Sequence, residues 1–270
     1  MSIIEEKDYY KKVQAYYNQD SENFEHRYWE NKTLQKIRES FRSETHIKPH
    51  SSILEIGFGP GLDTIYFAEQ NPSCHVFGID ISNGMHAYAE DQRQKKQLNN
   101  LTLKVGSVED IQTLFPDQKF DLIYVYFGAL NTVDNIEQIQ TYLNAVLKPN
   151  GSMVLTFVNK WYLMSILKPL AKLKLKTATK RLGKVWGGYS PTKFLASKCY
   201  SSRDIKRYFN SFNMIKKRGY SILFPAWYEN HINTKRPELC DKLWKMDIRL
   251  QKTPFWNLGE YALYIFKRKS

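Results

Sequence analysis

Three glycines at alternate positions, Gly57, Gly59 and Gly61, are the residues whose type and spacing point most directly to chemistry. They follow an apolar run that contains one acid, Glu55, and the segment 62–69 after them has the composition of a helix start. Glycine permits unusual backbone dihedrals and close approach of a ligand. A strand-to-helix turn of this kind presents free amide groups at the carboxyl end of a strand, where open α/β sheets bind ligands. The sequence therefore predicts a small-molecule site.

The spacing of these glycines distinguishes two kinds of cofactor site. Nicotinamide and flavin enzymes carry a G-x-G-x-x-G fingerprint, which requires glycine at position 62, where this chain has leucine. The spacing here is G-x-G-x-G, and with Glu55 in the preceding strand it resembles motif I of the class I S-adenosylmethionine (SAM) methyltransferases. The resemblance implies that the cofactor is contacted by Glu55, Gly57, Gly59 and Gly61.

A second acid, Asp80, ends the apolar segment 75–80, about 20 residues beyond the glycines. Dinucleotide-binding folds place there the carboxylate that holds the ribose hydroxyls. A helix cap is the alternative role, but Ser82 is the better cap candidate for the helix that follows. The continuation is similar to the family's D-x-S-x-x-M-x-x-x-A pattern, which implies cofactor contacts from Ile81 and from Met85, the latter near the adenine.

Two further segments match the family's order of motifs. After an expected strand at 101–105, the segment 106–110 resembles the adenine-contacting turn, in which an acid normally follows the glycine directly. Ser107 stands there instead, so the polar contact to the adenine amine is left open between Ser107, Glu109 and the backbone. A fourth strand is expected at 120–126. The resemblance implies cofactor contacts along both turns from Ser107, Val108, Glu109, Tyr126 and Phe127.

Strands and helices alternate along the chain, which predicts an α/β fold with a doubly wound, mostly parallel sheet. The family resemblance, which covers residues 51–158, implies seven strands, an N-terminal helical lid and helical insertions after strands five and six. The last two strands are expected as an antiparallel hairpin at 214–223 and 261–267, near an edge because both contain Lys and Arg. The other expected elements are a helix at 134–147 stopped by Lys148-Pro149-Asn150-Gly151, a strand at 152–158, a helix at 205–212 capped by Ser201 or Ser202, and a helix at 237–250.

The length of 270 residues and the 42% hydrophobic composition suit a single methyltransferase domain, 1–270. No stretch has the character of a signal peptide or of a membrane span, which predicts a cytoplasmic protein. Cys74, Cys199 and Cys240 lack the spacing of a zinc site, so we expect buried thiols and no metal. The expected parts are a helical lid at 1–48, a SAM-binding core at 51–158, a basic insertion at 159–200, and a C-terminal helix and hairpin with an aromatic insertion at 201–270.

The N-terminal segment carries aromatic residues at helical spacing, and two functions are open for them. One is packing against the sheet as ordinary core. The other is a lid over the cofactor, as in similar small-molecule methyltransferases, in which Tyr17 or Tyr28 contacts SAM. Aromatic faces suit the sulfonium cation, because ring quadrupoles attract positive charge by roughly 0.5 to 2 kcal/mol.

The insertion at 159–200 is strongly basic. No Asp or Glu occurs between positions 137 and 204, and the whole chain has a net charge of +13. Leucines and lysines fall on two stripes of one expected helix, which favours peripheral contact with an anionic membrane through residues 160–186. A solvated surface helix and an anionic substrate are the alternatives. The lysine stripe consists of Lys168, Lys172, Lys176 and Lys180.

The expected function is methyl transfer from SAM to a small-molecule acceptor, lipophilic or anionic, with S-adenosylhomocysteine (SAH) as product. C-, N- and O-transfer stay open, as does the oligomeric state. A non-catalytic SAM-binding regulator or scaffold and an RNA methyltransferase are the alternatives, the latter because of the basic charge. Nucleic acid is disfavoured, since no nucleic-acid module is evident and Tyr126-Phe127-Gly128-Ala129 stands in place of the N-P-P-Y tetrad of many amino-methylating nucleic-acid enzymes.

Methyl transfer from SAM depends mainly on alignment, and orientation can supply about 7 to 11 kcal/mol. A general base adds about 100-fold or more where the acceptor is not already nucleophilic. Asn131 follows the fourth strand, where the methyl group is expected, and a turn residue is its alternative role. A surface position is the alternative for His231. The catalytic candidates are Asn131, Tyr126, His231 and Tyr189.

The C-terminal insertion is rich in aromatic residues, among them Trp227 and Tyr228. They are candidates to wall an apolar acceptor pocket, with aromatic core packing as the alternative.

Overall fold

The computed structural model describes residues 3–188 and 194–269. Within them, seven strands form one sheet in the order β3-β2-β1-β4-β5-β7-β6. All neighbours pair in parallel except β7, which runs antiparallel to both β5 and β6. This is the expected doubly wound, mostly parallel sheet. The strands are β1 (Ser52–Ile56), β2 (His75–Asp80), β3 (Leu101–Val105), β4 (Phe120–Val125), β5 (Leu147–Val158), β6 (Phe212–Tyr220) and β7 (Tyr261–Arg268).

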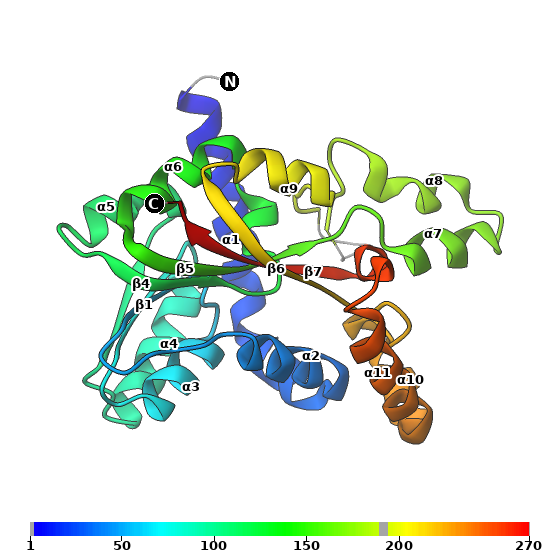
Figure 1. The fold of residues 1–270 in the computed structure, drawn as a ribbon, viewed down its shortest axis with the longest axis horizontal. Coiled ribbons are helices and arrows are strands. Elements are labelled where there is room, and N and C mark those ends of the chain that lie inside the picture. Colours follow the sequence, from blue (N-terminus) through cyan, green and yellow to red (C-terminus); the bar gives the residue numbers. More distant parts are fainter. Residues whose placement is uncertain (1–2, 189–193, 270) are drawn as a thin grey trace.

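Helices cover both faces of the sheet. In Figure 1, α5, α6 and α9 lie on one side, while α2, α3 and α4 lie on the other. The N-terminal segment forms two helices, as its aromatic spacing predicts. The helices are α1 (Ile3–Glu30), α2 (Lys32–Ser43), α3 (Leu62–Gln70), α4 (Asn83–Lys95), α5 (Ile111–Leu114), α6 (Ile136–Val146), α7 (Leu163–Leu170), α8 (Leu175–Ala178), α9 (Ser202–Tyr208), α10 (Asn230–Lys235) and α11 (Pro237–Leu250).

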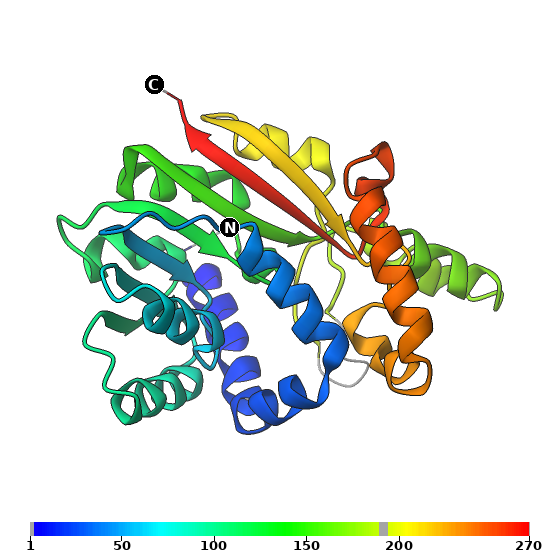
Figure 2. The same cartoon turned by 60° about the horizontal axis from the view of Figure 1, so that its bottom comes forward.

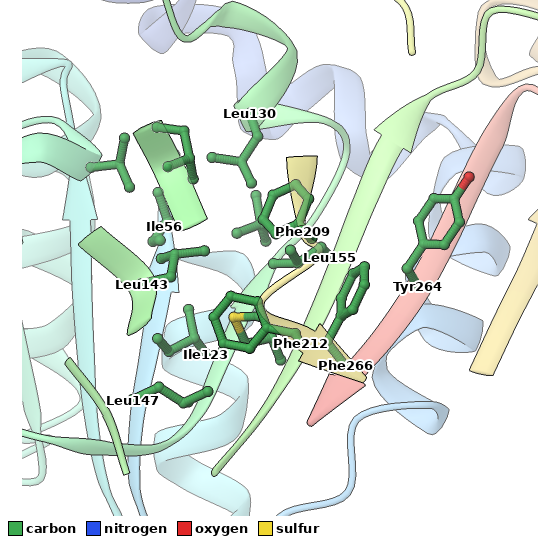
Figure 3. Packing of buried hydrophobic residues seen from close by; sticks show 14 of the residues in the cluster. Ile56, Ile123, Leu130, Leu143, Leu147, Leu155, Phe209, Phe212, Tyr264 and Phe266 are labelled. Atoms are coloured by element: carbon green, nitrogen blue, oxygen red, sulfur yellow. The ribbon is translucent and has the colours of Figure 1, made fainter. Parts of the chain in front are cut away.

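Alternation of side chains along β4 divides the core into two layers. Ile123 and Val125 pack on the α6 and α9 side, whereas Leu122 and Tyr124 pack on the α2 and α3 side. Figure 3 shows the first layer, in which leucines from α6 and β5 meet Phe209 just after α9, Phe212 of β6 and Phe266 of β7. Each such side chain contributes roughly 1.5 to 3 kcal/mol on full burial. Two buried faces therefore hold the strand ends in fixed positions.

Local capping chemistry confirms two helix starts. The Ser82 hydroxyl accepts a hydrogen bond from the Met85 amide at 3.1 Å and caps α4. Ser201 caps α9, with Asp204 completing a capping box. The helix before Lys148 ends at Val146, as expected, but β5 begins directly afterwards, earlier than the prediction of 152, and its pairing with β4 carries a register shift.

The C-terminal hairpin lies near an edge of the sheet, as expected. β6 is the edge strand, and β7 lies between β5 and β6 (Figure 2). Residues 261–266 are all buried, and the basic residues of β7 occupy only its last positions. Charge in β6 recurs along the strand, and Lys216 and Arg218 both reach Glu44. At this end of the sheet, the charged residues that protect the edge therefore lie mainly in β6.

The basic insertion corrects one expectation. The lysines do not share one continuous helix, because α7 ends at Leu170 and α8 begins at Leu175. The chain turns between them, with Leu173 at a left-handed φ of 55° and the Lys174 amide donating to the Pro169 carbonyl at 2.9 Å. Proline lacks the amide that would continue the helical ladder. In the part of the chain that the structure describes, no helix has the length and apolar character needed to cross a bilayer.

Candidate functional site

A cavity of about 450 Å³ opens at the carboxyl ends of the central strands and is covered by α1. Its wall is built from the loops that follow β1 to β4, together with the inner face of α1 and segments after β5 and β6. This is the position at which open α/β sheets bind ligands. The predicted residues that line it are Tyr17, Tyr28, Glu55, Gly57, Gly59, Asp80, Ile81, Met85, Ser107, Val108, Tyr126, Phe127 and Asn131.

The three glycines differ in what they do. All have positive φ angles, 75° at Gly57, 55° at Gly59 and 84° at Gly61. A Cβ on Gly57 would lie 2.5 Å from the Ala129 Cβ, and one on Gly61 would lie 2.9 Å from the Ala89 Cβ. A Cβ on Gly59 would meet no atom within 4 Å. Gly57 therefore permits contact between two loops, Gly61 permits α3 to pack on α4 away from the cavity, and Gly59 leaves backbone open to a ligand.

Asp80 is held by backbone amides on both carboxylate oxygens. Gly59 donates to Oδ2 at 2.8 Å and Ser82 donates to Oδ1 at 2.8 Å. Burial raises the pKa of the Asp80 carboxyl, and the two amides oppose that rise. The amides fix the carboxylate in one orientation at the cavity wall. Its remaining lone pairs are available to hydroxyl donors, since an ionised carboxylate accepts about four hydrogen bonds.

The turn after β3 places Ser107 and Glu109 in different surroundings. The Ser107 hydroxyl donates to Asp110 Oδ2 at 2.7 Å and its amide donates to the same oxygen at 2.8 Å, so Ser107 starts a capped turn. Ser107 and Val108 line the cavity. Glu109 is not among the lining residues, and it accepts a hydrogen bond from the Tyr10 hydroxyl of α1. Glu109 therefore binds α1 and does not form part of the described cavity wall.

A buried ionic cluster forms the floor of the cavity beside the glycine loop. Asp63 pairs with Arg38 and with Arg42, whose Nε lies 2.7 Å from Asp63 Oδ1. Glu55 accepts a hydrogen bond from the Tyr124 hydroxyl at 2.8 Å. Burial and then the nearby Asp63 charge raise the pKa of Glu55 well above its ordinary value. Two guanidinium groups therefore face the Asp63 carboxylate, and the raised pKa of Glu55 opposes a second negative charge beside them.

Arg38 and Asp63 are site residues that the sequence did not reveal. The Arg38 guanidinium lies 4.5 Å from the centre of the Phe127 ring and 4.9 Å from that of Tyr28. Both Arg38 and Asp63 line the cavity, and Arg38 Nε has no hydrogen-bond partner among the described residues. The one available signal was the apolar stripe of α2, which includes Ile37 next to Arg38. A stripe cannot predict which distant acid a buried arginine meets.

Helix α1 is fastened over the cavity by hydrogen bonds to the loops after β2 and β4. Tyr9 donates to the Thr132 carbonyl at 2.8 Å, and Gln14 donates to the Ile81 carbonyl at 2.8 Å. Asn18 Oδ1 accepts from the Ser82 hydroxyl at 2.7 Å. These bonds join α1 to the carboxyl ends of β2 and β4. The geometry is that of the expected lid, with Tyr17 and Tyr28 on its inner side.

The far end of the cavity is walled by the basic insertion and by the segment after β6. Trp186 and Leu195 come from the insertion, and Trp227 and Tyr228 from the later segment. Arg181 anchors the insertion through a buried ion pair in which its Nη2 lies 2.9 Å from each carboxylate oxygen of Glu260. The Arg181 guanidinium also lies 4.7 Å from the centre of the Trp186 ring. The pair therefore fixes a wall residue.

The catalytic candidates occupy three different environments. The Tyr126 hydroxyl lies 2.5 Å from the Thr45 hydroxyl and donates to the Phe41 carbonyl at 3.2 Å, and burial raises its pKa well above the ordinary value. Asn131 Nδ2 donates to the Lys198 carbonyl at 2.5 Å, and its Oδ1 accepts from the Val158 amide at 3.0 Å. Both residues line the cavity, but their polar groups are hydrogen-bonded to the protein groups just described.

The other two candidates lie away from the described cavity wall. His231 is exposed on α10 and is not a lining residue. Tyr189 falls outside the described residues. The three cysteines are buried free thiols, as expected. Among the side chains that the structure describes, no group of three or more histidines, cysteines and acids is arranged to hold a metal ion.

Comparison with known proteins adds a family. The family described as a methyltransferase domain matches residues 47–217. (S)-tetrahydroprotoberberine N-methyltransferase of Eschscholzia californica is 29% identical over 118 residues, 42% of this chain and 32% of that protein. Demethylmenaquinone methyltransferase of a Geobacillus species is 31% identical over 120 residues, 44% of this chain and 50% of that protein. The chain thus spans a third to a half of the length of these relatives.

Solved structures share the fold at low identity. A putative sarcosine dimethylglycine methyltransferase from Galdieria sulphuraria aligns with a TM-score of 0.56 and 16% identity, covering 87% of this chain and 86% of that one. Coclaurine N-methyltransferase bound to N-methylheliamine and SAH aligns with a TM-score of 0.56 and 16% identity, covering 86% and 72%. The cyclase SpnF aligns with a TM-score of 0.58 and 17% identity, covering 87% and 80%. Since this fold also occurs in a cyclase, activity has to be argued from the site.

Proposed function

The chain belongs to the class I SAM-dependent methyltransferase family, and from this premise we propose that it transfers a methyl group from SAM to a small molecule bound in the cavity beneath α1. The observation that carries the proposal is the convergence of three features on one cavity. These are the open glycine backbone at Gly59, the amide-held carboxylate of Asp80 and the buried guanidinium of Arg38.

The chemistry of these groups fits the three parts of SAM. The Asp80 carboxylate suits the ribose hydroxyls, as in dinucleotide sites. Ile81, Met85 and Val108 offer apolar surface to the adenine, and Ser107 lies beside them. Gly57 and Gly59 allow the methionine end to lie against backbone. The Arg38 guanidinium suits its carboxylate, because arginine pairs well with carboxylates and here has an unpartnered buried Nε.

We assign the acceptor to the aromatic end of the cavity. The wall there consists of Trp186, Leu195, Trp227 and Tyr228, with Val158 at the end of β5. Small-molecule sites are mostly apolar with a few polar groups that fix orientation. This composition supports an acceptor with a largely apolar body. Quinone-like and alkaloid-like acceptors, named in the relatives above, are consistent with it.

The proposed mechanism rests on alignment rather than on a strong base. SAM supplies an electrophilic methyl group on a good leaving group. The lid α1 excludes water, and the wall holds the acceptor in line, for which orientation contributes about 7 to 11 kcal/mol. We propose that Tyr126 and Asn131 shape the wall through the hydrogen bonds that occupy them. A neutral tyrosine with a raised pKa cannot accept a proton at neutral pH.

Outside the cavity, we propose that residues 160–186 contact an anionic membrane surface. The chain has a net charge of +13, and this segment contains lysines and one arginine but no acid. Each lysine close to an anionic bilayer contributes about 1 kcal/mol. A membrane partner is consistent with an acceptor that has an apolar body.

Calorimetric titration with SAH tests the cofactor site. The intact chain should bind SAH, and Asp80→Asn should weaken binding by roughly 10- to 100-fold, since hydrogen bonds to a charged group contribute about 1.5 to 3 kcal/mol. Asp91→Asn on the exposed face of α4 is the matched control and should leave affinity unchanged. Absence of SAH binding would refute the proposal. Binding by the intact chain with no transfer to any labelled acceptor would favour a non-catalytic SAM-binding role.

A further inference from the structure

Helices α7 and α8 form a pair that stands away from the rest of the molecule. In Figures 1 and 2 the pair projects at one end, beyond the sheet. No residue of α7 is buried, and α8 buries only Ala178. A helix normally buries an apolar stripe against the core. Here the apolar stripe of α7 is at most partly buried, and Leu167 and Leu170 at its end are exposed.

The turn of this pair exposes leucines side by side. The exposed fraction is 89% for Leu173 and 66% for Leu175, with 47% for Leu167 and 39% for Leu170 at the end of α7. Every residue from 171 to 177 is exposed. Single exposed apolar residues are normal, but a contiguous group on one short turn marks an interaction site.

Lysines alternate with these leucines. Lys172, Lys174 and Lys176 flank Leu173 and Leu175 along the chain, and no acid occurs between positions 137 and 204. None of the three lysines takes part in an ion pair among the described residues, whereas Lys168 pairs with Glu229 at 2.5 Å. The turn therefore presents apolar side chains inside a ring of uncompensated positive charge.

We infer that the turn between α7 and α8, residues 167–176, inserts Leu173 and Leu175 into the interfacial layer of an anionic bilayer while its lysines bind lipid headgroups. The inference rests on the proposed membrane contact of residues 160–186 and identifies the part that enters the lipid. Interfacial segments bind through buried apolar area together with attraction to anionic lipids. Both are present in these ten residues.

Charge and composition favour a bilayer over the two other occupants. A second copy of the chain would bring the same lysines against these, and like charges on facing surfaces repel. A nucleic acid would use the lysines but would leave the leucines in water. An anionic bilayer is matched by both side-chain types, since lysine stems lie along apolar surface while their charges reach the headgroups.

Insertion is measured with a fluorophore at position 173. Because Cys74, Cys199 and Cys240 are all buried, an environment-sensitive thiol dye will label Leu173→Cys selectively. Vesicles of phosphatidylglycerol and phosphatidylcholine should shift its emission to the blue, and phosphatidylcholine alone should not. Lys252→Cys, exposed beyond α11, carries the same dye as a control and should show no shift. If the protein binds the vesicles but the dye at position 173 keeps the emission of a dye in water, the inference of insertion is wrong.

Vesicle flotation separates the two contributions. Lys172→Gln, Lys174→Gln and Lys176→Gln together should weaken binding on the order of 100-fold at low salt. Lys242→Gln, Lys245→Gln and Lys252→Gln remove the same charge from the α11 region and should change binding far less. Leu173→Glu with Leu175→Glu should abolish flotation. If adsorption is only electrostatic, the variant with Leu173→Gln and Leu175→Gln will bind vesicles as tightly as the intact chain. This result would refute insertion.

The readouts distinguish this inference from the cofactor proposal. SAH titration of every variant should match that of the intact chain, because no substituted residue lines the cavity. Intact SAH binding without flotation would reject the membrane inference alone. A dimer that dissociates on Leu173→Glu with Leu175→Glu, measured by light scattering, would reassign the patch to self-association. If RNA competes with vesicles for the protein, and RNA binding persists in the variant with Leu173→Glu and Leu175→Glu, the lysines would be reassigned to nucleic-acid binding.

Discussion

Two buried acids near the ends of neighbouring strands, Asp80 and Glu55, differ in the groups that shift their pKa. Asp80 is met by two backbone amides, which favour its ionised form against the cost of burial. Burial and then the nearby Asp63 charge raise the pKa of Glu55, and the hydrogen bond from the Tyr124 hydroxyl opposes that rise. The two amides hold the Asp80 carboxylate in place as an acceptor for hydroxyl groups. Glu55 lies near the arginine pair that Asp63 binds.

The raised pKa of Glu55 predicts a pH-dependent stability. For an acid whose folded pKa exceeds its ordinary value of 4.5, the stabilisation is fully present below that value and is lost as pH rises through the folded pKa. The intact chain should therefore lose stability relative to Glu55→Gln as pH increases above about 4.5. Urea unfolding at several pH values checks this. Exposed Glu137→Gln is the control, and a pH-independent difference for Glu55→Gln would contradict the prediction.

The glycine loop predicts opposite outcomes for two alanine substitutions. Gly57→Ala should destabilise the fold, because its Cβ would lie 2.5 Å from the Ala129 Cβ. Gly59→Ala should cost only about 1 to 2 kcal/mol of backbone strain, since its Cβ meets nothing within 4 Å, yet it should weaken SAH binding. Thermal unfolding and SAH titration of both variants separate the effects. Unchanged SAH affinity in Gly59→Ala would exclude close approach of the cofactor to this backbone.

At the level of elements, a buried ion pair ties the basic insertion to Glu260, the residue before β7. Arg181 and Glu260 are both buried, so loss of one side chain removes the buried counter-charge of the other. Arg181→Met should cost about 3 to 5 kcal/mol of unfolding free energy. The double variant with Glu260→Gln should recover much of that loss. Chemical unfolding of the four proteins in the cycle measures the coupling, and additive losses would show that the pair is not an anchor.

Local patterns predicted the elements that carry the cofactor loops. Strand ends at Glu55 and Asp80, the serine caps and the helix stop before Lys148 all depend on residues within a few positions of one another. Such features follow from backbone sterics and capping, which act locally. The order of these elements then determined the sheet. For this reason most of the described cavity wall near the glycines was predictable.

The features that local patterns did not determine depend on contacts between distant segments. The apolar and basic periodicity of 163–180 satisfied a helix pattern, but the turn at Leu173 follows Pro169 and no packing partner holds the helix straight. Arg38 meets Asp63 only after α2 has packed beside α3. His231 lies in a segment whose polar composition suited either a site or a surface, and packing exposed it. The spacing of residues along the sequence does not indicate which distant segments will make these contacts.

On the scale of the whole molecule, ligand binding should appear as thermal stability. A ligand present at about 100 times its Kd stabilises the folded state by about 2.7 kcal/mol. For a domain of this size that corresponds to roughly 5 to 10 °C in Tm. Saturating SAH should produce this shift and NAD should not, which differential scanning fluorimetry can measure. Equal stabilisation by NAD would point to a dinucleotide site in place of a SAM site.

The place of β7 between β5 and β6 has a consequence for synthesis on the ribosome. Strands β1 to β5 can pair as they emerge, but β6 has no neighbour in the sheet until residues 261–268 have been made. Until then the β5 edge is open, and open edges invite pairing with other chains. The β5 edge therefore stays unpaired until β7 has been made, and we expect this interval to be the one in which the nascent chain is most prone to pair with other chains.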